Sequence, residues 1–353
     1  MVKNSSFPQI VLQWYEKNKR ELPWRKTLDP YAIWLSEIIL QQTRIDQGLA
    51  YYLKFIDAFP TVHDFANASE DDILKMWQGL GYYSRARNMH GTAKTIVEKH
   101  HGKFPADYAS LLRLKGVGEY TAAAIASMAF GLPHATVDGN VYRVLSRVYG
   151  IDTPIDTGKA KKEFTRLANE LIDSSQPGNF NQAVMEFGAI QCKPKNPDCK
   201  KCPFRQRCVA WKNDTIDLLP IKRGKTKIRK RYFNYLIIEQ DQYTYLNKRT
   251  KNDIWQNLYE FPLIETIEKS ELVTIMKDFQ FLFLPGTEIQ IIKESHWQKQ
   301  VLTHQHIFYR FIYLKIDGKI DIPSSMIRVN KKDISNFAVP KPIEKELEQN
   351  NWT

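Results

Sequence analysis

Hydrophobic positions recur every three or four residues from Pro8 to about Trp211, which is the spacing of one face of an α-helix. In the stretch PYAIWLSEIILQQT this spacing places Trp34 and Ile38 on one side of a helix. We expect further helices near residues 45–58, 84–99, 121–130, 139–149, 158–173 and 179–191. Because short breaks containing Pro or Gly separate these segments, the first part of the chain is predicted to be mainly α-helical.

The pattern changes after Pro220, where a basic segment leads into a different kind of sequence. Residues 222–231 read KRGKTKIRKR and carry seven basic side chains, as a solvated linker does. The later strings YFNYLIIE, QYTYLNKR, TEIQIIKE and IFYRFIYLKI alternate in polarity or are rich in β-branched and aromatic residues. With two helical segments near 270–278 and 342–349, they predict a smaller α+β domain.

We therefore expect a helical domain over residues 1–215, a basic interdomain linker over 216–230 and an α+β domain over 231–353. A chain of 353 residues is long enough for two domains with separate cores. Its 43% hydrophobic and 25% charged residues are ordinary for a globular protein.

Hydropathy and charge narrow the choice of partners. No apolar run reaches the roughly 18 residues needed to cross a bilayer, so we expect no membrane contact. The first residues, MVKNSSFPQIVLQWYEKN, contain no uninterrupted apolar core, so we also expect no secretory signal. A formal net charge of +12 and a pI near 9.3 are compatible with a polyanionic partner.

All four cysteines lie in the stretch CKPKNPDCKKCPFRQRC, as Cys192, Cys199, Cys202 and Cys208. Without a secretory signal, two disulfides in an oxidising compartment are disfavoured. Four clustered thiolates predict either a tetrahedral zinc site or an iron–sulfur cluster, and the spacing by itself does not separate the two. The Lys and Arg residues between the cysteines indicate a phosphate-binding surface.

A glycine turn precedes the helix predicted at 121–130. Gly116 and Gly118 flank Val117 in LKGVGEYTAA, which permits a tight turn and a close backbone approach. The helix that follows offers free N–H groups to an anion. In a basic helical chain the turn indicates a contact with the DNA backbone, although an ordinary connection between two helices uses the same residues.

Two carboxylates stand in informative surroundings. Asp138 begins the helix GNVYRVLSRV, where it either caps the helix or faces a ligand, and Val141 cannot complete a capping box. Glu37 lies in the apolar stretch YAIWLSEIILQQT, either on the polar face of an amphipathic helix or in a dry pocket. In a dry pocket, desolvation would raise the pKa of Glu37 and make it a candidate general acid.

Several motifs occur together and in order. They are LPWR, WLSEIILQQT, GLGYYSRARN, LKGVGEYTAAAIA, VDGNVYRVLSRV, FNQAVMEFGA and the cysteine spacing. Together they resemble the MutY-type adenine DNA glycosylases, which belong to the helix-hairpin-helix superfamily with endonuclease III. The resemblance runs from residue 8 to about residue 212 and continues more thinly through NDIWQNLYEFP and VLTHQH. It implies a mainly α helix-hairpin-helix glycosylase domain with an iron–sulfur loop, followed by an α+β Nudix-like domain.

The family hydrolyses the N-glycosidic bond of adenine mispaired with 8-oxoguanine or guanine in duplex DNA. The resemblance implies that Glu37 protonates the departing adenine and that Asp138 stabilises the positively charged sugar, roles that carboxylates play in other glycoside hydrolyses. Tyr120 and Asn140 would support these two groups. The residues expected around the extruded adenine are Trp24, Arg25, Gln182 and Glu186.

The resemblance also implies how DNA is held. Gln42 and Tyr82 are similar to the wedge residues that enter the base stack beside the lesion, and residues 116–118 would grip the backbone. The four cysteines would bind a 4Fe-4S cluster with a structural and DNA-positioning role. We expect a monomer whose partner is double-stranded DNA with adenine opposite 8-oxoguanine or guanine. In a bacterium it would work in the cytoplasm, at the nucleoid.

One position bears on the reaction type. Bifunctional members of the superfamily carry a lysine nucleophile where this chain has Tyr120, and Lys115 precedes the glycine turn on another element. The resemblance therefore implies a monofunctional hydrolase rather than a lyase that nicks the strand.

The second domain resembles a Nudix domain without its catalytic box, because LYEFPLIETIEKSELVTIM lacks a dense Glu cluster. Family precedent gives this domain the recognition of 8-oxoguanine, with Thr303 and His304 in the recognition loop. The family often has Phe-Ser-His there, and this chain keeps a hydroxyl but has Leu302 in place of the aromatic residue. A plain turn between two strands is the alternative interpretation.

Three rival functions fit these residues less well. A catalytically silent DNA-binding module would lack Glu37 or Asp138, and both are present. A glycosylase-lyase for oxidised pyrimidines fits poorly with Tyr120 and with the extra domain. A Nudix-type nucleotide hydrolase is disfavoured by the missing box.

Overall fold

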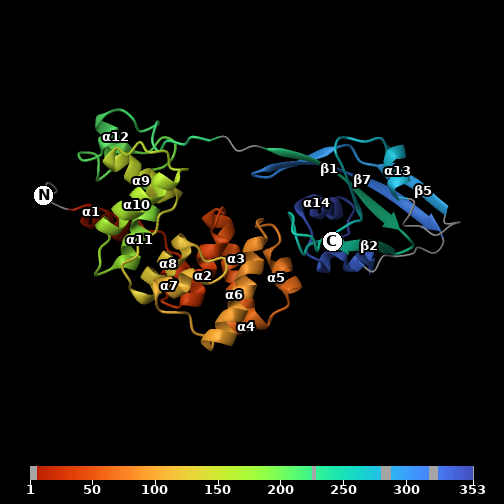
Figure 1. Cartoon of the computed structure of the whole chain (residues 1–353), viewed down its shortest axis with the longest axis horizontal. Coiled ribbons are helices and arrows are strands. Elements are labelled where there is room, and N and C mark those ends of the chain that lie inside the picture. The colour runs from red at the N-terminus through yellow and green to blue at the C-terminus, as the bar shows by residue number, and fades with distance from the viewer. Residues whose placement is uncertain (1–5, 225–227, 280–287, 318–324, 353) are drawn as a thin grey trace. The chain divides into compact units, whose positions relative to one another are not determined.

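The computed structural model describes residues 6–224, 228–279, 288–317 and 325–352. The chain forms two compact units, which Figure 1 shows as a group of helices and a group of strands with short helices. The first unit contains residues 1–67 and 88–224, and the second contains residues 68–87 and 225–353. The mainly helical first part and the α+β second part confirm the predicted fold class.

The first unit is built from helices. They are α1 (Phe7–Asn18), a 3₁₀ turn (Pro23–Arg25), α2 (Pro30–Ile39), α3 (Ile45–Ala58), α4 (Val62–Asn67), α6 (Ser84–His100, from residue 88 on), α7 (Tyr108–Leu112), α8 (Glu119–Phe130), α9 (Gly139–Tyr149), α10 (Gly158–Leu171), α11 (Pro177–Glu186), a π-helical turn (Phe187–Gln191), a 3₁₀ turn (Cys199–Lys201) and α12 (Val209–Lys212). The helix expected at 179–191 is thus divided, because α11 changes to π-helical geometry after Glu186.

Helices α2 and α8 pack against each other inside the first unit. Every residue of α2 from Tyr31 to Ile39 is buried, and so is every residue of α8 from Thr121 to Ser127. A helix that is buried all round has no solvent-facing polar side. Of the two interpretations of Glu37, the structure therefore supports the buried one.

A second core lies between α1, the later helices and the cysteine segment. It contains Phe7 and Val11 of α1, Val144 of α9, Phe180 of α11 and Phe204. The rings of Phe7 and Phe204 stack with their centroids 4.8 Å apart. Because Phe204 lies between the last two cysteines, this packing holds the cysteine segment against the helices that carry the candidate site.

The second unit combines two sheets with short helices. Its elements are α5 (Glu70–Trp77), β1 (Arg229–Glu239), β2 (Tyr243–Lys248), β3 (Tyr259–Glu260), β4 (Leu263–Thr266), α13 (Leu272–Phe279), β5 (Glu288–Glu294), β6 (Gln298–Val301), β7 (Gln305–Asp317), β8 (Met326–Asn330), a 3₁₀ helix (Lys331–Asn336) and α14 (Lys341–Gln349). The strands and both helices expected from the sequence are present.

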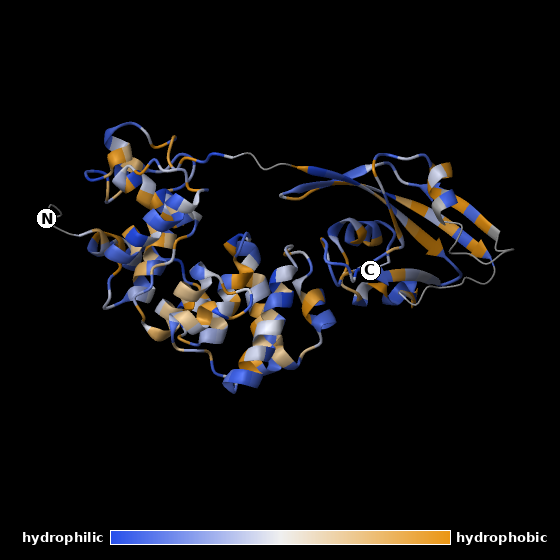
Figure 2. Ribbon diagram, viewed as in Figure 1, coloured by the Kyte–Doolittle hydropathy of each residue, from blue (hydrophilic) through white to orange (hydrophobic). Residues whose placement is uncertain are grey.

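The larger sheet has the order β4-β1-β7-β5, with β6 also paired to β7, and the smaller has the order β3-β2-β8. Strands β1 and β7 are parallel, in a register that pairs Arg229 with Gln305. One face of the larger sheet packs Phe233 and Phe311 against Ile343 of α14, whereas the other packs Leu236 against Ile275 of α13. Its central strands are therefore buried on both faces, and Figure 2 shows hydrophobic and hydrophilic residues interleaved along the elements.

No helix among the described residues combines the length and the apolar character needed to span a membrane.

Candidate active site

Glu37 lies on the last turn of α2, with 6% of its surface exposed. Burial raises the pKa of this carboxyl to about 7, while a hydrogen bond from Tyr120 opposes the rise. The nearby charge of Asp138 raises the pKa further, and the charge of Arg25 lowers it. A carboxyl group with this pKa is partly protonated at neutral pH, so it can act as a general acid.

Tyr120 lies in the first turn of α8 and points its hydroxyl at Glu37. The hydroxyl donates to Oε2 of Glu37 at 2.7 Å and also approaches Sδ of Met185 at 3.1 Å. Burial raises the pKa of Tyr120 well above its usual value, so the phenol stays neutral. It can therefore orient the carboxyl group as a hydrogen-bond donor.

Asp138 caps α9 and also lines the cavity that contains Glu37. Its Oδ1 accepts the backbone N–H groups of Asn140 and Val141 at 2.9 and 2.8 Å, and its Oδ2 accepts the side-chain amide of Asn140 at 2.8 Å. Burial raises the pKa of Asp138, and these three donors oppose the rise. Asp138 thus caps the helix and also faces the cavity, so its two interpretations do not exclude each other.

Arg143 connects the first turn of α9 to the cysteine segment. Its Nη2 donates to Oδ1 of Asn140 at 2.8 Å and to the carbonyl of Gly188 at 2.7 Å, and its Nε donates to the carbonyl of Cys192 at 2.8 Å. A Cβ at Gly188 would lie 2.6 Å from Cβ of Asn140, so this close approach requires glycine. Asn140 is held from both sides as a result.

Charged and polar groups from α11 and the loop after α1 form another wall. Glu186 is 1% exposed and pairs with Arg20 at 2.6 Å and with Arg25 at 2.8 Å. Burial would raise the pKa of Glu186, but the hydrogen bonds from the two arginines outweigh it and hold the pKa at about 2. Gln182 accepts from Nε of Arg25 at 3.1 Å. Trp24 is buried and packs edge to face on Tyr52.

These groups surround one cavity of about 540 Å³. The predicted site residues that line it are Trp24, Arg25, Glu37, Gln42, Tyr120, Asp138, Asn140, Gln182 and Glu186. Arg20 and Met185 also line it, and the sequence motifs gave no reason to single them out. A pocket of this size accommodates a nucleoside, and it presents one carboxyl group that can be protonated beside a second, hydrogen-bonded one.

The glycine turn has the geometry expected of it. Gly116 has φ of 78°, and a Cβ there would lie 2.8 Å from Cβ of Asn88. Val117 is buried, which anchors the turn, whereas Gly118 is exposed at the N-cap of α8 without a side-chain cap. The first amide groups of α8 are therefore available to an anion.

The two predicted wedge residues share an uncommon backbone conformation. Gln42 has φ of 59° and Tyr82 has φ of 48°, both in the left-handed region that residues other than glycine seldom adopt. Gln42 is exposed and Tyr82 is 50% exposed. Seven other described residues that are not glycine share this conformation, so the wedge role of Gln42 and Tyr82 stays a prediction.

In the second unit, Thr303 and His304 lie in a four-residue turn that joins β6 to β7. The turn is closed by the N–H of Leu302 donating to the carbonyl of Gln305 at 2.8 Å. The hydroxyl of Thr303 lies 2.5 Å from that of Tyr82. Thr303, His304 and Tyr82 line a pocket of about 390 Å³, which also contains Trp255. The structure thus brings the predicted loop residues together with one predicted wedge residue.

Arg231 supports this turn from β1. It is 5% exposed and binds Asp253 and Glu265 through paired hydrogen bonds of 2.6 to 2.9 Å. Its Nη1 also approaches Oε1 of Gln305, the residue after His304, at 3.3 Å. A guanidinium group that binds two carboxylates is held rigidly. Arg231 therefore fixes the position of the residues that follow the turn.

The four cysteines are free and line one small cavity with Phe187, Phe204 and Trp211. Beside it, the fully buried Arg147 donates to the carbonyls of Lys193, Pro194 and Leu219 at 2.8 to 3.2 Å. Its Nη1 also lies 3.5 Å from Sγ of Cys192. Burial raises the pKa of the thiols of Cys199, Cys202 and Cys208, and the positive charge of Arg147 opposes the rise at Cys199 and Cys208.

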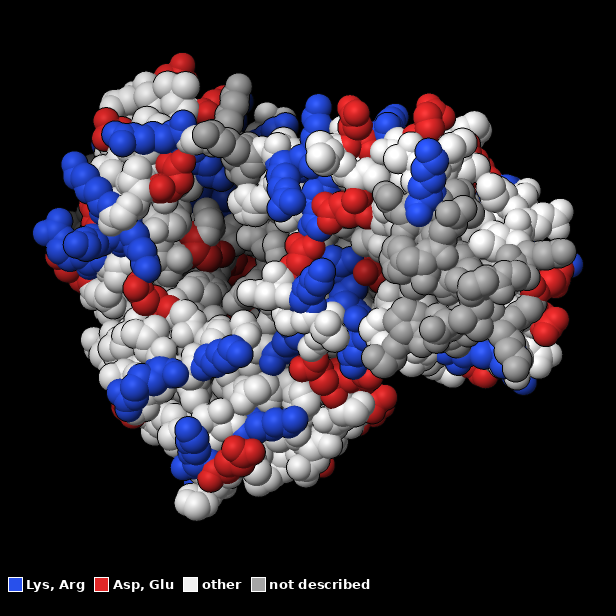
Figure 3. Space-filling model, turned by 45° about the vertical axis from the view of Figure 1, so that its right-hand side comes forward, with Lys and Arg blue, Asp and Glu red and all other residues white. Residues whose placement is uncertain are grey.

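Basic side chains are spread over the face of the molecule drawn in Figure 3, with acidic side chains among them. The exposed cations of the cysteine segment include Lys193, Lys195 and Lys200. Their presence next to the thiol cavity agrees with the predicted phosphate-binding surface.

Comparison with known proteins identifies both parts of the chain. Residues 35–170 match the profile of the HhH-GPD superfamily of base excision DNA repair proteins, and residues 234–349 match that of the NUDIX domain. The chain is similar to a thermostable thymine-DNA glycosylase, with 31% identity, a TM-score of 0.55 and coverage of 59% of this chain and 95% of that one. A trapped endonuclease III–DNA complex, at 22% identity and a TM-score of 0.51, covers 59% of this chain and 94% of its own and shows the same fold.

Curated relatives match from 58% to 97% of this chain. The adenine DNA glycosylase of Homo sapiens is 41% identical over 215 residues, which are 58% of this chain and 39% of the human protein. The adenine DNA glycosylase of Buchnera aphidicola subsp. Schizaphis graminum is 33% identical over 352 residues, which are 97% of this chain and 98% of that protein. This chain therefore belongs to the adenine DNA glycosylase family, and it is a hydrolase of base excision repair.

Proposed function

We propose that the chain removes adenine paired with 8-oxoguanine or guanine, after the adenine has been flipped out of the duplex into the cavity around Glu37. The observation that carries this proposal is that Glu37, with a pKa of about 7, and the N-capping Asp138 line the same nucleoside-sized cavity. One carboxyl group can donate a proton and the other can stabilise positive charge, which is the pair that cleavage of a glycosidic bond requires.

In this mechanism Glu37 donates its proton to a ring nitrogen of adenine as the bond between that base and C1′ breaks. The bonding electrons leave with the base, and the carboxylate of Asp138 stabilises the positive charge that develops on the sugar. Water then adds at C1′ and loses a proton, which leaves an abasic site. The Arg25, Gln182 and Glu186 wall holds the base in place through polar groups that are already oriented.

The reaction stops at the abasic site because no lysine is among the residues that line the cavity. Tyr120 occupies the position at which bifunctional relatives carry lysine, and its hydroxyl is bonded to Glu37. Lys115 is exposed and is not part of the lining. We therefore propose a monofunctional glycosylase.

The second unit reads the base opposite adenine. The pocket lined by Tyr82, Thr303 and His304 supplies a hydroxyl, an imidazole and aromatic surface beside one another. The hydroxyl can hydrogen-bond an edge of 8-oxoguanine, and His304 can approach the adjacent phosphate.

A 4Fe-4S cluster would bind at the cysteine cavity, because all four free thiols line it. Cys192, Cys199, Cys202 and Cys208 would hold it. A bound cluster would fix the shape of residues 192–208 and hence the position of their cations on DNA. Hydrolysis requires no electron transfer, so we assign the cluster a structural role.

The proposal is tested with duplexes that contain adenine opposite 8-oxoguanine, guanine or thymine, followed by alkaline cleavage of the product. We expect excision from the first two duplexes, slow or no excision from the third, and no strand break without added base. Glu37→Gln and Asp138→Asn should each reduce single-turnover excision by about 10²–10⁴-fold while DNA binding survives.

The matched control is Glu16→Gln, which alters an exposed carboxyl on α1. Near-native excision by Glu37→Gln or Asp138→Asn at saturating enzyme would show that the replaced carboxyl group does not have its proposed catalytic role. Strand breakage without added base would show that the enzyme is a lyase and not a monofunctional glycosylase.

A further inference from the structure

The segment between α8 and α9 carries Asp138 into the cavity without being a helix or a strand itself. Residues 131–137 run from the end of α8 to Asp138. Beyond Asp138 the carboxylate is fixed by the amides of α9. Its distance from Glu37 therefore depends on how this linker, residues 131–137, is held against α8.

Asn181 on α11 holds the linker from inside the protein. Its Oδ1 accepts the N–H of Thr136 at 3.0 Å, and its Nδ2 donates to the carbonyl of His134 at 2.8 Å. The same Nδ2 donates to the hydroxyl of Ser127 on α8 at 2.8 Å. With 1% of its surface exposed, Asn181 has both amide hydrogens bonded, so its side-chain orientation is determined.

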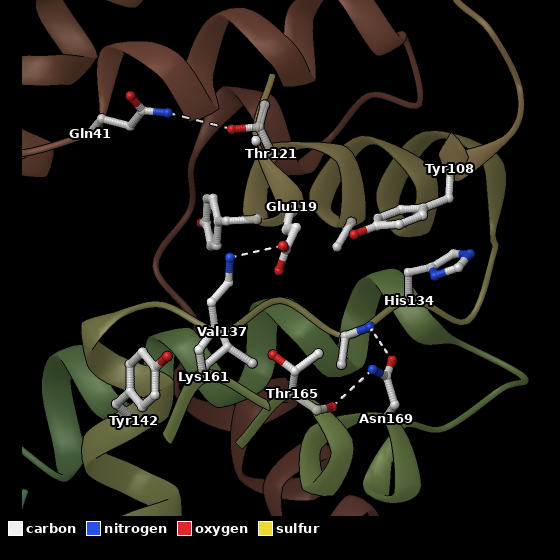
Figure 4. Close-up of a pocket in the computed structure, with 14 residues that line it drawn as sticks. Gln41, Tyr108, Glu119, Thr121, His134, Val137, Tyr142, Lys161, Thr165 and Asn169 are labelled. Atoms are coloured by element: carbon white, nitrogen blue, oxygen red, sulfur yellow. Dashed lines mark hydrogen bonds and ion pairs between the residues drawn. The ribbon is translucent and has the colours of Figure 1, made fainter. Parts of the chain in front are cut away.

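Two further contacts of the linker, shown in Figure 4, involve residues that are less buried than Asn181. The rings of Tyr108 and His134 stack 4.3 Å apart, and Oδ1 of the exposed Asn169 accepts the N–H of Ala135 at 3.0 Å. These contacts line a cavity of about 520 Å³ that shares Tyr120 with the active-site cavity. Water can replace a hydrogen bond at the surface, whereas loss of a buried amide leaves backbone groups without a partner.

A continuous set of contacts thus joins the two carboxyl groups. Asp138 follows the linker, the linker binds Asn181, and Asn181 lies on α11. Met185 of the same helix contacts the hydroxyl of Tyr120, and that hydroxyl binds Glu37. Asn181 is not among the residues that line the active-site cavity, so it can affect the reaction without touching adenine.

We propose that Asn181 is a positioning residue for adenine excision, which sets the place of Asp138 relative to Glu37 through the linker. This inference rests on the proposed roles of the two carboxyl groups. A displacement of a catalytic group by about 1 Å can cost 10²-fold in rate. Removing the amide should therefore reduce the chemical step far more than the binding of DNA.

The test compares Asn181→Ala with Ser127→Ala. Ser127 is equally buried and bonded to Asn181, but its loss leaves both contacts of Asn181 with the linker intact. Asn181→Ala should lower single-turnover excision by about 10- to 100-fold. Ser127→Ala removes one of the three hydrogen bonds of Asn181, so it should lower thermal stability by a smaller amount and change excision by less than about threefold. Affinity for a duplex with a non-cleavable adenine analogue should stay within about threefold in both variants.

The milder variant Asn181→Ser is measured in parallel, so that the test does not depend on whether Asn181→Ala folds. The positioning role is wrong if the Asn181 variants excise adenine at the native rate. It is also wrong if their loss of rate only matches their loss of DNA affinity, or is no larger than the loss of rate caused by Ser127→Ala. Asp138→Asn is included in the same assay. If Asp138→Asn excises adenine normally, the proposed function fails; if it is inactive while Asn181→Ala is native-like, the inference alone fails.

Discussion

The hydroxyl of Tyr120 donates a hydrogen bond of 2.7 Å to Oε2 of Glu37, which is a buried carboxyl group. This bond stabilises the ionised carboxylate, whereas burial stabilises the protonated acid. Burial has the larger effect, and the resulting pKa of about 7 makes Glu37 a group that can hold and release a proton near neutrality. The pair therefore determines how the proposed reaction responds to pH.

The excision rate of the native protein should fall as pH rises through about 7, because the Glu37 acid loses its proton there. Well above this pH, single-turnover rates should drop about tenfold per pH unit. On the acid side the rate should fall when Asp138 is protonated, at a pH above the usual range of an aspartate. Rapid-quench measurements on the 8-oxoguanine duplex give the acid and alkaline limbs of this pH–rate profile. A flat profile between pH 6 and 9 would contradict the acid role of Glu37.

Tyr120→Phe should move the alkaline limb of that profile to higher pH. The hydrogen bond from Tyr120 lowers the pKa of Glu37, so its removal raises this pKa and keeps the acid protonated over a wider range. At the optimum the rate should fall by less than about tenfold, the effect of one lost hydrogen bond. Tyr142→Phe, which removes a hydroxyl outside the active-site cavity, is the control. A shift of the limb to lower pH would show that the bond has another role.

Glu37→Gln should stabilise the protein at pH 8 although it abolishes excision. The folded pKa of about 7 lies above the usual value of 4.5, so the ionised Glu37 destabilises the folded state. The penalty is absent below pH 4.5, grows as pH rises to about 7 and reaches at most about 3 kcal/mol. Urea unfolding at pH 5 and pH 8 measures it. We expect a gain at pH 8 that is much smaller at pH 5, and no such difference for Glu16→Gln.

Purified protein should be brown and contain about four irons with matching sulfide. Cys199→Ser should lower soluble yield, iron content and DNA affinity together, because the ligands and the cations share one segment. Lys200→Ser alters an exposed cation of that segment and should reduce DNA affinity while keeping the iron. If protein produced anaerobically with ample iron contains stoichiometric zinc and no sulfide, the cysteines form a zinc site and not an iron–sulfur cluster.

Thr303→Ala combined with His304→Ala should weaken the preference for adenine opposite 8-oxoguanine over adenine opposite guanine. Loss of such contacts costs about 1–3 kcal/mol, or about 5- to 150-fold in discrimination. Saturating single-turnover excision should change much less than in Glu37→Gln, because these residues line a pocket in the second unit. Thr274→Ala, in an exposed threonine of α13, is the control. Full parental preference at matched salt would mean that another group reads the lesion.

The sequence determined the features that depend on neighbouring residues. Helical spacing in α2, α8 and α9, the alternation in β2 and the glycine turn are local, so their periods and turn residues are visible without a structure. The cysteine spacing and the ordered motifs placed the chain in its family for the same reason. Of the site residues, the motifs singled out Glu37, Asp138 and Tyr120, and the cavity contains all three.

Tertiary structure decided the contacts between residues that are distant in sequence. The partners Tyr120 and Glu37 are 83 residues apart, Arg20 and Glu186 are 166 apart, and Tyr82 and Thr303 are 221 apart. Whether Glu37 is solvated or buried depends on the packing of α8 against α2, which no period within α2 encodes. Asn181 is likewise an ordinary amide in the sequence, and its role depends on a linker that folding brings to it. Burial and hydrogen bonding act through space, and they alone set the proton affinity and the position of a carboxyl group.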